Sequence, residues 1–260
     1  VNDAPAVKKS NIGIAMGITG TDVAKESSDM VLLDDNFSTI VNAIEEGRGI
    51  FDNIRKFVNY LLSCNIAEVL VVFFALVIFQ HQPLTATMLL WINVITDGLP
   101  AVALGLDRAE KDIMSYSPKK FQGHVISKRL WIEMIIFGVM LTIGVLGIYE
   151  YNIIVKGPEQ ASAAAFIAVV IFELVRLLFI RSDYKTSLFS NKWLLTAVAF
   201  SLVMQVALVY IPFTATIFRV SSIDLVDWLY IVVVSVILWY GFRFIRKLLD
   251  HFPYFASEKI

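Results

Sequence analysis

The chain has 260 residues, of which 57% are hydrophobic and only 17% are charged, and its formal net charge is −1. This composition excludes a disordered chain and differs from that of an ordinary soluble domain, in which about a quarter of the residues are charged. The near-zero charge predicts no nucleic-acid partner, and the single cysteine excludes an internal disulfide.

The first 57 residues are mixed in character and predict the end of an α/β unit. Its expected elements are two short strands and a helical turn, at 12–16, 30–33 and 21–27. Ser38 is a suitable N-cap for a helix leading towards the first apolar run. Gly47 and Gly49 each weaken such a helix by up to about 1 kcal/mol, so a flexible juncture there is the alternative.

Six long apolar runs follow, and each approaches the roughly 20 residues that cross a bilayer. They lie near 58–79, 84–106, 128–149, 163–181, 193–212 and 225–245. A large soluble helical core is the alternative, but six such runs are hard to bury in a chain of this length. We therefore expect a mainly α, polytopic membrane protein, divided into the tail of an α/β domain, a stalk helix and a six-helix membrane domain, at 1–37, 38–57 and 58–260.

Lysine and arginine are unevenly distributed between the connecting segments. They are concentrated around 48–56, 108–129, 181–192 and 243–247. The turns on the opposite side carry only Lys156 and Arg219. Because positive loops stay in the cytoplasm, both ends of the chain are expected there.

Polar residues fall near the middle of three of the six runs. They are Asn65, Glu68, Asn93, Thr96, Asp97 and Glu173. A carboxylate at mid-bilayer is costly unless it is paired, protonated or hydrated, and three at one depth repel one another. Spacings of three and four residues place the members of each run on one helix face. A bound cation at their meeting point would resolve the repulsion.

Pro100 points to the same region, because a proline leaves the carbonyl of residue i−4 without its helical hydrogen bond. That residue is Thr96, and Gly98 makes local unwinding easier. We therefore expect a broken helix around Thr96–Asp97 with exposed carbonyl oxygens. Irregular backbone at membrane depth is tolerated only in a protein-lined or wet site, and broken helices mark ion sites in transporters.

The predicted ligands are all oxygen atoms, which suits a hard cation. Calcium accepts six to eight oxygens in flexible geometry, magnesium demands a strict octahedron, and manganese also accepts oxygen. Copper and zinc are not expected, and Cys64 is interpreted as a small packing residue. Two alternatives stay open: Thr96 as interhelical hydrogen-bond glue, and Glu173 paired with Arg176 rather than with an ion.

The motifs resemble a known family. The hinge region of P-type cation-transporting ATPases is similar to the run VNDAPAVKKSNIGIAMGITGTDVAKESSDMVLLDDNFSTIV. The fifth and sixth membrane helices of calcium pumps of the sarcoplasmic/endoplasmic reticulum type, prokaryotic relatives included, are similar to LLSCNIAEV and LLWINVITDGLPAVALGLDRAEKDIM. The resemblance is specific up to about residue 114. Beyond that, only the six-span topology and Glu173 carry it.

The resemblance implies a Rossmann-like phosphorylation domain at the start and family helices five to ten over 58–245. Asn2 and Asp3 would lie beside a phosphorylated aspartate and its magnesium. The implied ion ligands are Asn65, Glu68, Asn93, Thr96, Asp97 and Glu173. The transported ion would be Ca²⁺, with Mg²⁺ and ATP used by the intact enzyme. Arg176, one turn past Glu173, departs from the family pattern. Its guanidinium could neutralise Glu173 and take the place of a second ion.

Several parts of such a pump are absent from this sequence: the D-K-T-G-T and T-G-E-S motifs, the nucleotide domain and the fourth-helix ligands. We therefore expect the C-terminal part of a longer pump, inactive alone, with membrane lipid and the upstream catalytic domains as its partners. The membrane would be the plasma membrane in a prokaryote and an internal membrane otherwise. The alternatives are a pump for Mn²⁺, Na⁺ or H⁺, and a stand-alone, non-enzymatic ion-binding membrane protein.

Overall fold

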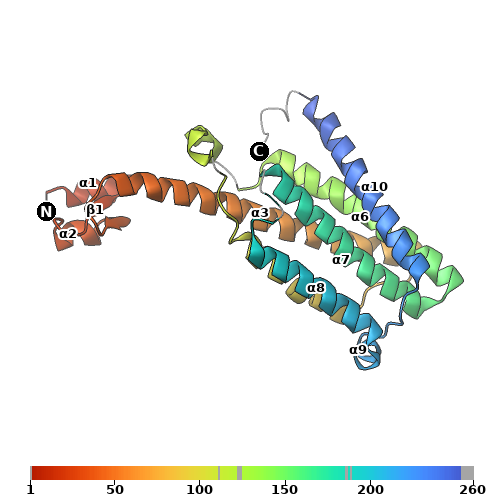
Figure 1. Ribbon diagram of the computed structural model, residues 1–260. Helices are drawn as coiled ribbons and strands as arrows, with labels where there is room; N and C mark the ends of the chain where they lie inside the picture. Colours follow the sequence, from red (N-terminus) through yellow and green to blue (C-terminus); the bar gives the residue numbers. More distant parts are fainter. Residues whose placement is uncertain (1, 111, 122–124, 185–186, 188, 253–260) are drawn as a thin grey trace. The chain divides into compact units, whose positions relative to one another are not determined.

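The computed structural model describes residues 2–110, 112–121, 125–184, 187 and 189–252 (Figure 1). The chain divides into two compact units, residues 1–51 with 111–121 and residues 52–110 with 122–260.

The first unit contains two short parallel strands. β1 (Ile14–Met16) pairs with β2 (Met30–Leu32), and Ile14 lies opposite Met30. Helix α1 (Ala4–Lys9) precedes the strands, and α2 (Asp22–Glu26) connects them. The predicted strands and helical turn are therefore confirmed. That they belong to a larger Rossmann-like domain stays a prediction.

A tight turn follows β2 and leads into α3 (Ser38–Phe74). Asp35 adopts a left-handed conformation with φ 50°, and its carboxylate accepts hydrogen bonds from the backbone N–H of Ile18 (2.8 Å) and Thr19 (2.7 Å). The bond from Ile18 lowers the pKa of Asp35. The side chain of Asn36, rather than that of Ser38, accepts the N–H at the helix start, so the prediction of Ser38 as N-cap is wrong.

Helix α3 is continuous through both glycines at which we considered a flexible juncture. In the first unit, the segment that contains η3 (Ile113–Ser115) and η4 (Pro118–Phe121) packs against this helix. Arg48 donates hydrogen bonds to the backbone oxygens of Ile113 (3.0 Å) and Tyr116 (3.1 Å). The segment is thus held by a side chain of α3.

Six helical segments among the described residues are long and apolar enough to cross a membrane, as predicted. They are α3 with η1 (Ala75–Phe79), α4 (Ala86–Trp91) with η2 (Ile92–Asp97) and α5 (Gly98–Leu104), α6 (Lys128–Val155), α7 (Pro158–Asp183), α8 (Lys192–Tyr210) and α10 (Leu225–Asp250). The short helix α9 (Pro212–Phe218) lies between α8 and α10 in the chain.

Helix α7 is the most buried of these six segments. It packs beside α6 and α10, as Figure 1 shows, and also contacts α8 and η2. Its first half carries buried small side chains, including Ala161, Ala164 and Ala168. Such residues let membrane helices approach closely. The buried position of α7 determines where its polar side chains, described below, can act.

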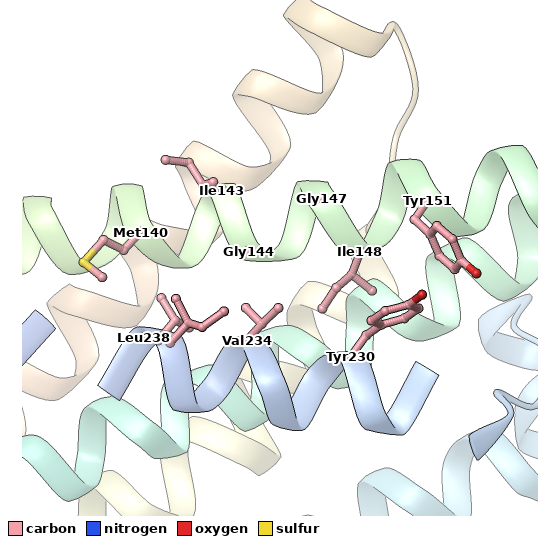
Figure 2. Close-up of a pocket in the computed structure, with 10 residues that line it drawn as sticks. Met140, Ile143, Gly144, Gly147, Ile148, Tyr151, Tyr230, Val234 and Leu238 are labelled. Carbon is pink, nitrogen blue, oxygen red and sulfur yellow. The ribbon is translucent and has the colours of Figure 1, made fainter. Parts of the chain in front are cut away.

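An apolar groove of about 510 Å³ lies between α6 and α10 (Figure 2). Tyr151 and Tyr230 face each other at one end, with ring centroids 4.9 Å apart. Gly144 permits the close approach of the two helices, because a Cβ there would meet Val234 at 2.8 Å. The residues that line the groove include no carboxylate that could bind a cation. A cation-binding site is therefore sought among the polar side chains of the other spans.

The start of α10 is fixed by a reciprocal cap. Asp224 accepts hydrogen bonds from the backbone N–H groups of Val226 (3.0 Å) and Asp227 (3.1 Å), and Asp227 accepts one from the N–H of Asp224 (3.2 Å). Lys156, which follows α6, lies 2.9 Å from Asp224 and 2.8 Å from Asp227. The bonds from Lys156 and from the Asp227 N–H lower the pKa of Asp224.

We expect Asp224→Ala to lower the Tm of the purified protein by a few °C at neutral pH, because the cap and an ion pair are lost. The pKa of Asp224 in the folded protein lies below its ordinary value of 3.8. The stabilisation is therefore complete at pH values above 3.8 and is lost as the pH falls through the pKa of the folded protein. The Tm difference should therefore shrink as the pH falls from about 7 to about 3. Glu159→Gln, at an exposed position, is the control; a difference independent of pH would contradict the prediction.

Candidate cation-binding site

The second membrane segment changes its winding at the predicted place. Between α4 and α5 the backbone forms the π-helix η2, which ends at Asp97, three residues before Pro100. The carbonyl oxygen of Ile95 in this segment accepts a hydrogen bond from Ser201 of α8 (3.0 Å). The predicted irregularity is therefore confirmed, but the predicted break is wrong, because the segment stays helical and contains a widened turn.

Asp97 is fully buried at the end of η2. Its Oδ1 accepts a hydrogen bond from the hydroxyl of Tyr60 on α3 at 3.0 Å, while its Oδ2 has no hydrogen-bond partner among the described residues. Gly98 follows directly, and a Cβ there would meet the carbonyl oxygen of Asn93 at 3.1 Å. A larger residue at 98 would therefore crowd the π-helical turn that positions Asp97.

Glu173 projects from α7 towards Asp97. It is 1% exposed, and within the part of the chain that the structure describes neither of its carboxylate oxygens has a hydrogen-bond partner. One oxygen of Asp97, one of Glu173 and the sulfur of Cys64 all lie within 4.8 Å of one another. Buried polar atoms are normally hydrogen-bonded, so three unpartnered carboxylate oxygens in one place require an explanation.

Glu68 and Asn93 form the second part of the site. The Asn93 amide nitrogen donates to both oxygens of Glu68, at 3.0 and 2.7 Å, and also to the Leu89 carbonyl. Glu68 is buried on α3, one helical turn beyond Cys64. Of the six predicted ligands, the structure thus brings together Asp97 with Glu173 and Glu68 with Asn93.

The other two predicted ligands make only local hydrogen bonds. Asn65 is exposed, and its amide donates to the carbonyl of Leu61 at 2.9 Å. Thr96 is buried, but its hydroxyl donates to the carbonyl of Ile92 at 3.1 Å. Asn65 therefore lies outside the cluster, although it belongs to the same apolar run as Glu68.

Sequence reasoning missed two residues of the cluster, Tyr60 and Cys64. A signal for them existed, because Tyr60, Cys64 and Glu68 are spaced by four residues and lie on one helix face. The buried side of α3 follows this spacing, whereas Asn65 lies about 100° further round the helix. The interpretation of Cys64 as a packing residue overlooked its place beside two carboxylates.

Arg176 does not form an ion pair with Glu173, contrary to both roles considered for it. Its guanidinium donates to Ser63 Oγ (3.1 Å) and to Asn59 Oδ1 (2.9 Å) on α3. It also lies over the rings of Phe137 and Phe242, 5.3 and 5.1 Å from their centroids. Among the described residues, no lysine or arginine forms an ion pair with the three carboxylates of the cluster.

The matching family model is that of the C-terminus of cation-transporting ATPases, and it covers residues 81–249. The chain belongs to this cation-transporting ATPase family. A calcium-transporting ATPase of Bacillus subtilis is 41% identical over 244 residues, covering 91% of this chain and 27% of the relative. Calcium-transporting ATPase 1 of Yarrowia lipolytica is 37% identical over 247 residues (92% and 26%). The human calcium-transporting ATPase type 2C member 1 is 36% identical over 237 residues (89% and 26%).

The chain spans about a quarter of the length of these relatives. The range covered by the family model contains Asn93, Asp97 and Glu173, and the alignments to the relatives extend over most of the remaining chain. Asn2 and Asp3 lie in the first unit, where both are exposed. The Asp3 carbonyl accepts the N–H groups of Ala6 and Val7 at the start of α1.

Proposed function

We propose that this chain forms the cation-binding membrane part of an ATP-driven calcium pump, with Ca²⁺ as its cargo. The observation that carries the proposal is the pair of buried carboxylates, Asp97 and Glu173, of which three oxygens have no hydrogen-bond partner in the described structure. Keeping such groups ionised within membrane helices requires a compensating charge. Relatives named as calcium-transporting support Ca²⁺ as that charge.

The proposed ligands are the side chains of Glu68, Asn93, Asp97 and Glu173, together with carbonyl oxygens of η2. Thr96 would join them only after its hydroxyl leaves the Ile92 carbonyl. Asn65 would have to turn from its exposed position. Carboxylate, amide and carbonyl oxygens in adjustable geometry suit Ca²⁺ better than Mg²⁺.

In the intact enzyme, ATP and Mg²⁺ would be used by catalytic domains of the same polypeptide. We assign Asn2 and Asp3 to the support of a phosphorylated aspartate and its Mg²⁺, since amide and carboxylate oxygens are suitable ligands. Formation and hydrolysis of an aspartyl phosphate would move α3 and reshape the membrane site. The distribution of lysine and arginine supports a cytoplasmic location of both ends, in the plasma membrane of a prokaryote or an internal membrane otherwise.

The test uses the intact polypeptide, reconstituted into sealed vesicles with ATP and Mg²⁺ outside. We expect Ca²⁺ to accumulate inside only when ATP is hydrolysed, and to leave again when an ionophore is added. Accumulation of Mn²⁺ but not of Ca²⁺ inside the vesicles would mean that Mn²⁺ is the cargo, since Mn²⁺ accepts the same oxygen ligands. Ca²⁺ movement that needs no ATP would overturn the pump and favour a stand-alone channel.

A further inference from the structure

Cys64 is one of three buried residues whose possible ligand atoms come together in the carboxylate cluster. Its thiol belongs to α3, whereas Asp97 ends η2 and Glu173 belongs to α7. The sulfur and one oxygen from each carboxylate lie within 4.8 Å of one another, and all three residues are buried. Three different helical elements thus direct one possible metal ligand each to the same point.

Most of the carboxylate oxygens in this part of the cluster accept no hydrogen bond from a described residue. Tyr60 donates to Oδ1 of Asp97, but Asp97 Oδ2 and both oxygens of Glu173 find no hydrogen-bond partner among the residues that the structure describes. Arg176 is directed to Asn59 and Ser63 and supplies these oxygens with no hydrogen bond. Buried acceptors without donors require an explanation, and a cation held between them would supply one.

A sulfur ligand changes which metal ions such a group of ligands binds most tightly. Carboxylate and carbonyl oxygens suit Ca²⁺, Mg²⁺ and Mn²⁺, whereas a thiolate selects softer metals, including Zn²⁺. Zinc is held by four ligands, with bonds of about 2.3 Å to sulfur and about 2.0–2.2 Å to carboxylate oxygen. In tetrahedral geometry, ligand atoms around one zinc ion therefore lie about 3.3–3.6 Å apart, so the present cluster would have to close by roughly 1 Å to hold it.

We propose that Cys64 determines the metal specificity of this site, because its sulfur, with Asp97 and Glu173, forms a mixed sulfur–oxygen site for a thiophilic divalent cation such as Zn²⁺. The proposal rests on the proposed function, since the same carboxylates would hold Ca²⁺ through oxygen alone. Sulfur binds zinc as the thiolate, so binding transfers the thiol proton to the solvent. Zn²⁺ would then occupy the cargo site and compete with Ca²⁺.

Two variants separate coordination by sulfur from simple packing. Cys64→Ser keeps a small polar atom but replaces the soft ligand by a hard one, and Cys64→Ala removes the ligand. Loss of a residue that is hydrogen-bonded to a metal ligand lowers the metal affinity about 10–100-fold. Loss of the ligand itself should therefore lower the Zn²⁺ affinity at least about tenfold. His81→Gln is the matched control, because it removes an exposed zinc-binding type of side chain outside the cluster.

In the intact, purified protein we would measure Ca²⁺-dependent phosphoenzyme and its inhibition by Zn²⁺. The ratio of the Zn²⁺ inhibition constant to the Ca²⁺ activation constant is expected to rise at least about tenfold in both Cys64 variants and to stay unchanged in His81→Gln. An unchanged ratio in both Cys64 variants would overturn the proposal.

A second readout does not depend on activity. Co²⁺ bound to a thiolate absorbs in the near ultraviolet, so titration with Co²⁺ should give a sulfur-to-metal band in the wild type that both Cys64 variants lack. The same band in Cys64→Ala would show that another sulfur binds the metal, and would overturn the role of Cys64. Absence of Ca²⁺-dependent phosphoenzyme from the wild type, with the cobalt band present, would instead reject the proposed function and leave the sulfur–oxygen site standing.

Discussion

Replacing Asp97 by asparagine is expected to abolish Ca²⁺-dependent phosphoenzyme formation in the intact pump. Asp97 is fully buried, has one unpartnered oxygen and lies beside the unpartnered carboxylate of Glu173. Asparagine keeps the shape and the acceptor for Tyr60 but removes the negative charge that would bind the ion. We expect the Ca²⁺ requirement to rise by more than about a hundredfold, or ~2.7 kcal/mol of binding free energy.

The matched control is Glu150→Gln, which removes a carboxylate from the partly buried end of α6, outside the cluster. Both proteins should be recovered in similar amount and with similar Tm, because neither change leaves a buried cation without its partner. Phosphoenzyme formed by Asp97→Asn at the Ca²⁺ concentration that serves Glu150→Gln would show that Asp97 is not a ligand.

The membrane fold was predictable because hydropathy over about 20 residues is a local property of the sequence. The same is true of the irregular second span, where Pro100 and Gly98 predicted a change that the structure shows as η2. The form of that change was not predictable. Whether a helix widens or unwinds depends on partners such as Ser201, which lies about a hundred residues away in the sequence and supports the Ile95 carbonyl.

The candidate site was predictable only in part, for two physical reasons. Buried carboxylates stand out at mid-span, so Glu68, Asp97 and Glu173 could be named without a structure. The direction of a side chain depends on which face of the helix meets its neighbours, and this placed Cys64 inward and Asn65 outward on α3. The direction of the Arg176 side chain likewise depends on its hydrogen bonds to Asn59 and Ser63. The spacing of Arg176 in the sequence does not predict these partners.

Charges near the ends of the spans were interpreted only as signals of orientation, yet some of them are buried together. Asp107 is fully buried after α5, and its carboxylate lies 3.4 Å from Lys56 of α3 and 3.4 Å from Arg181 of α7. Asn191, the N-cap of α8, donates to the same carboxylate at 2.8 Å. Asn53 donates to the Asp107 carbonyl at 2.8 Å. One anion therefore joins three membrane helices.

Asp107→Ala is expected to destabilise the protein by ~3–5 kcal/mol, because it leaves Lys56 and Arg181 buried without their shared carboxylate. Both cations are only 2% exposed, so water cannot replace the lost partner without local opening. The Tm of the purified protein, followed by tryptophan fluorescence, should fall by roughly 10 °C. Asp107→Asn keeps the hydrogen-bonding shape without the charge and should give an intermediate fall.

A second variant shows whether unpaired charge, rather than a cavity, causes the loss. Adding Lys56→Met to Asp107→Ala removes one of the two cations that have lost their shared carboxylate while filling similar space, so part of the lost Tm should return. Asp22→Ala, which removes a 95% exposed carboxylate from a surface ion pair, should leave the Tm unchanged. If the double variant were less stable than Asp107→Ala, the loss would come from packing, and Asp107 would not be the shared counter-ion of these helices.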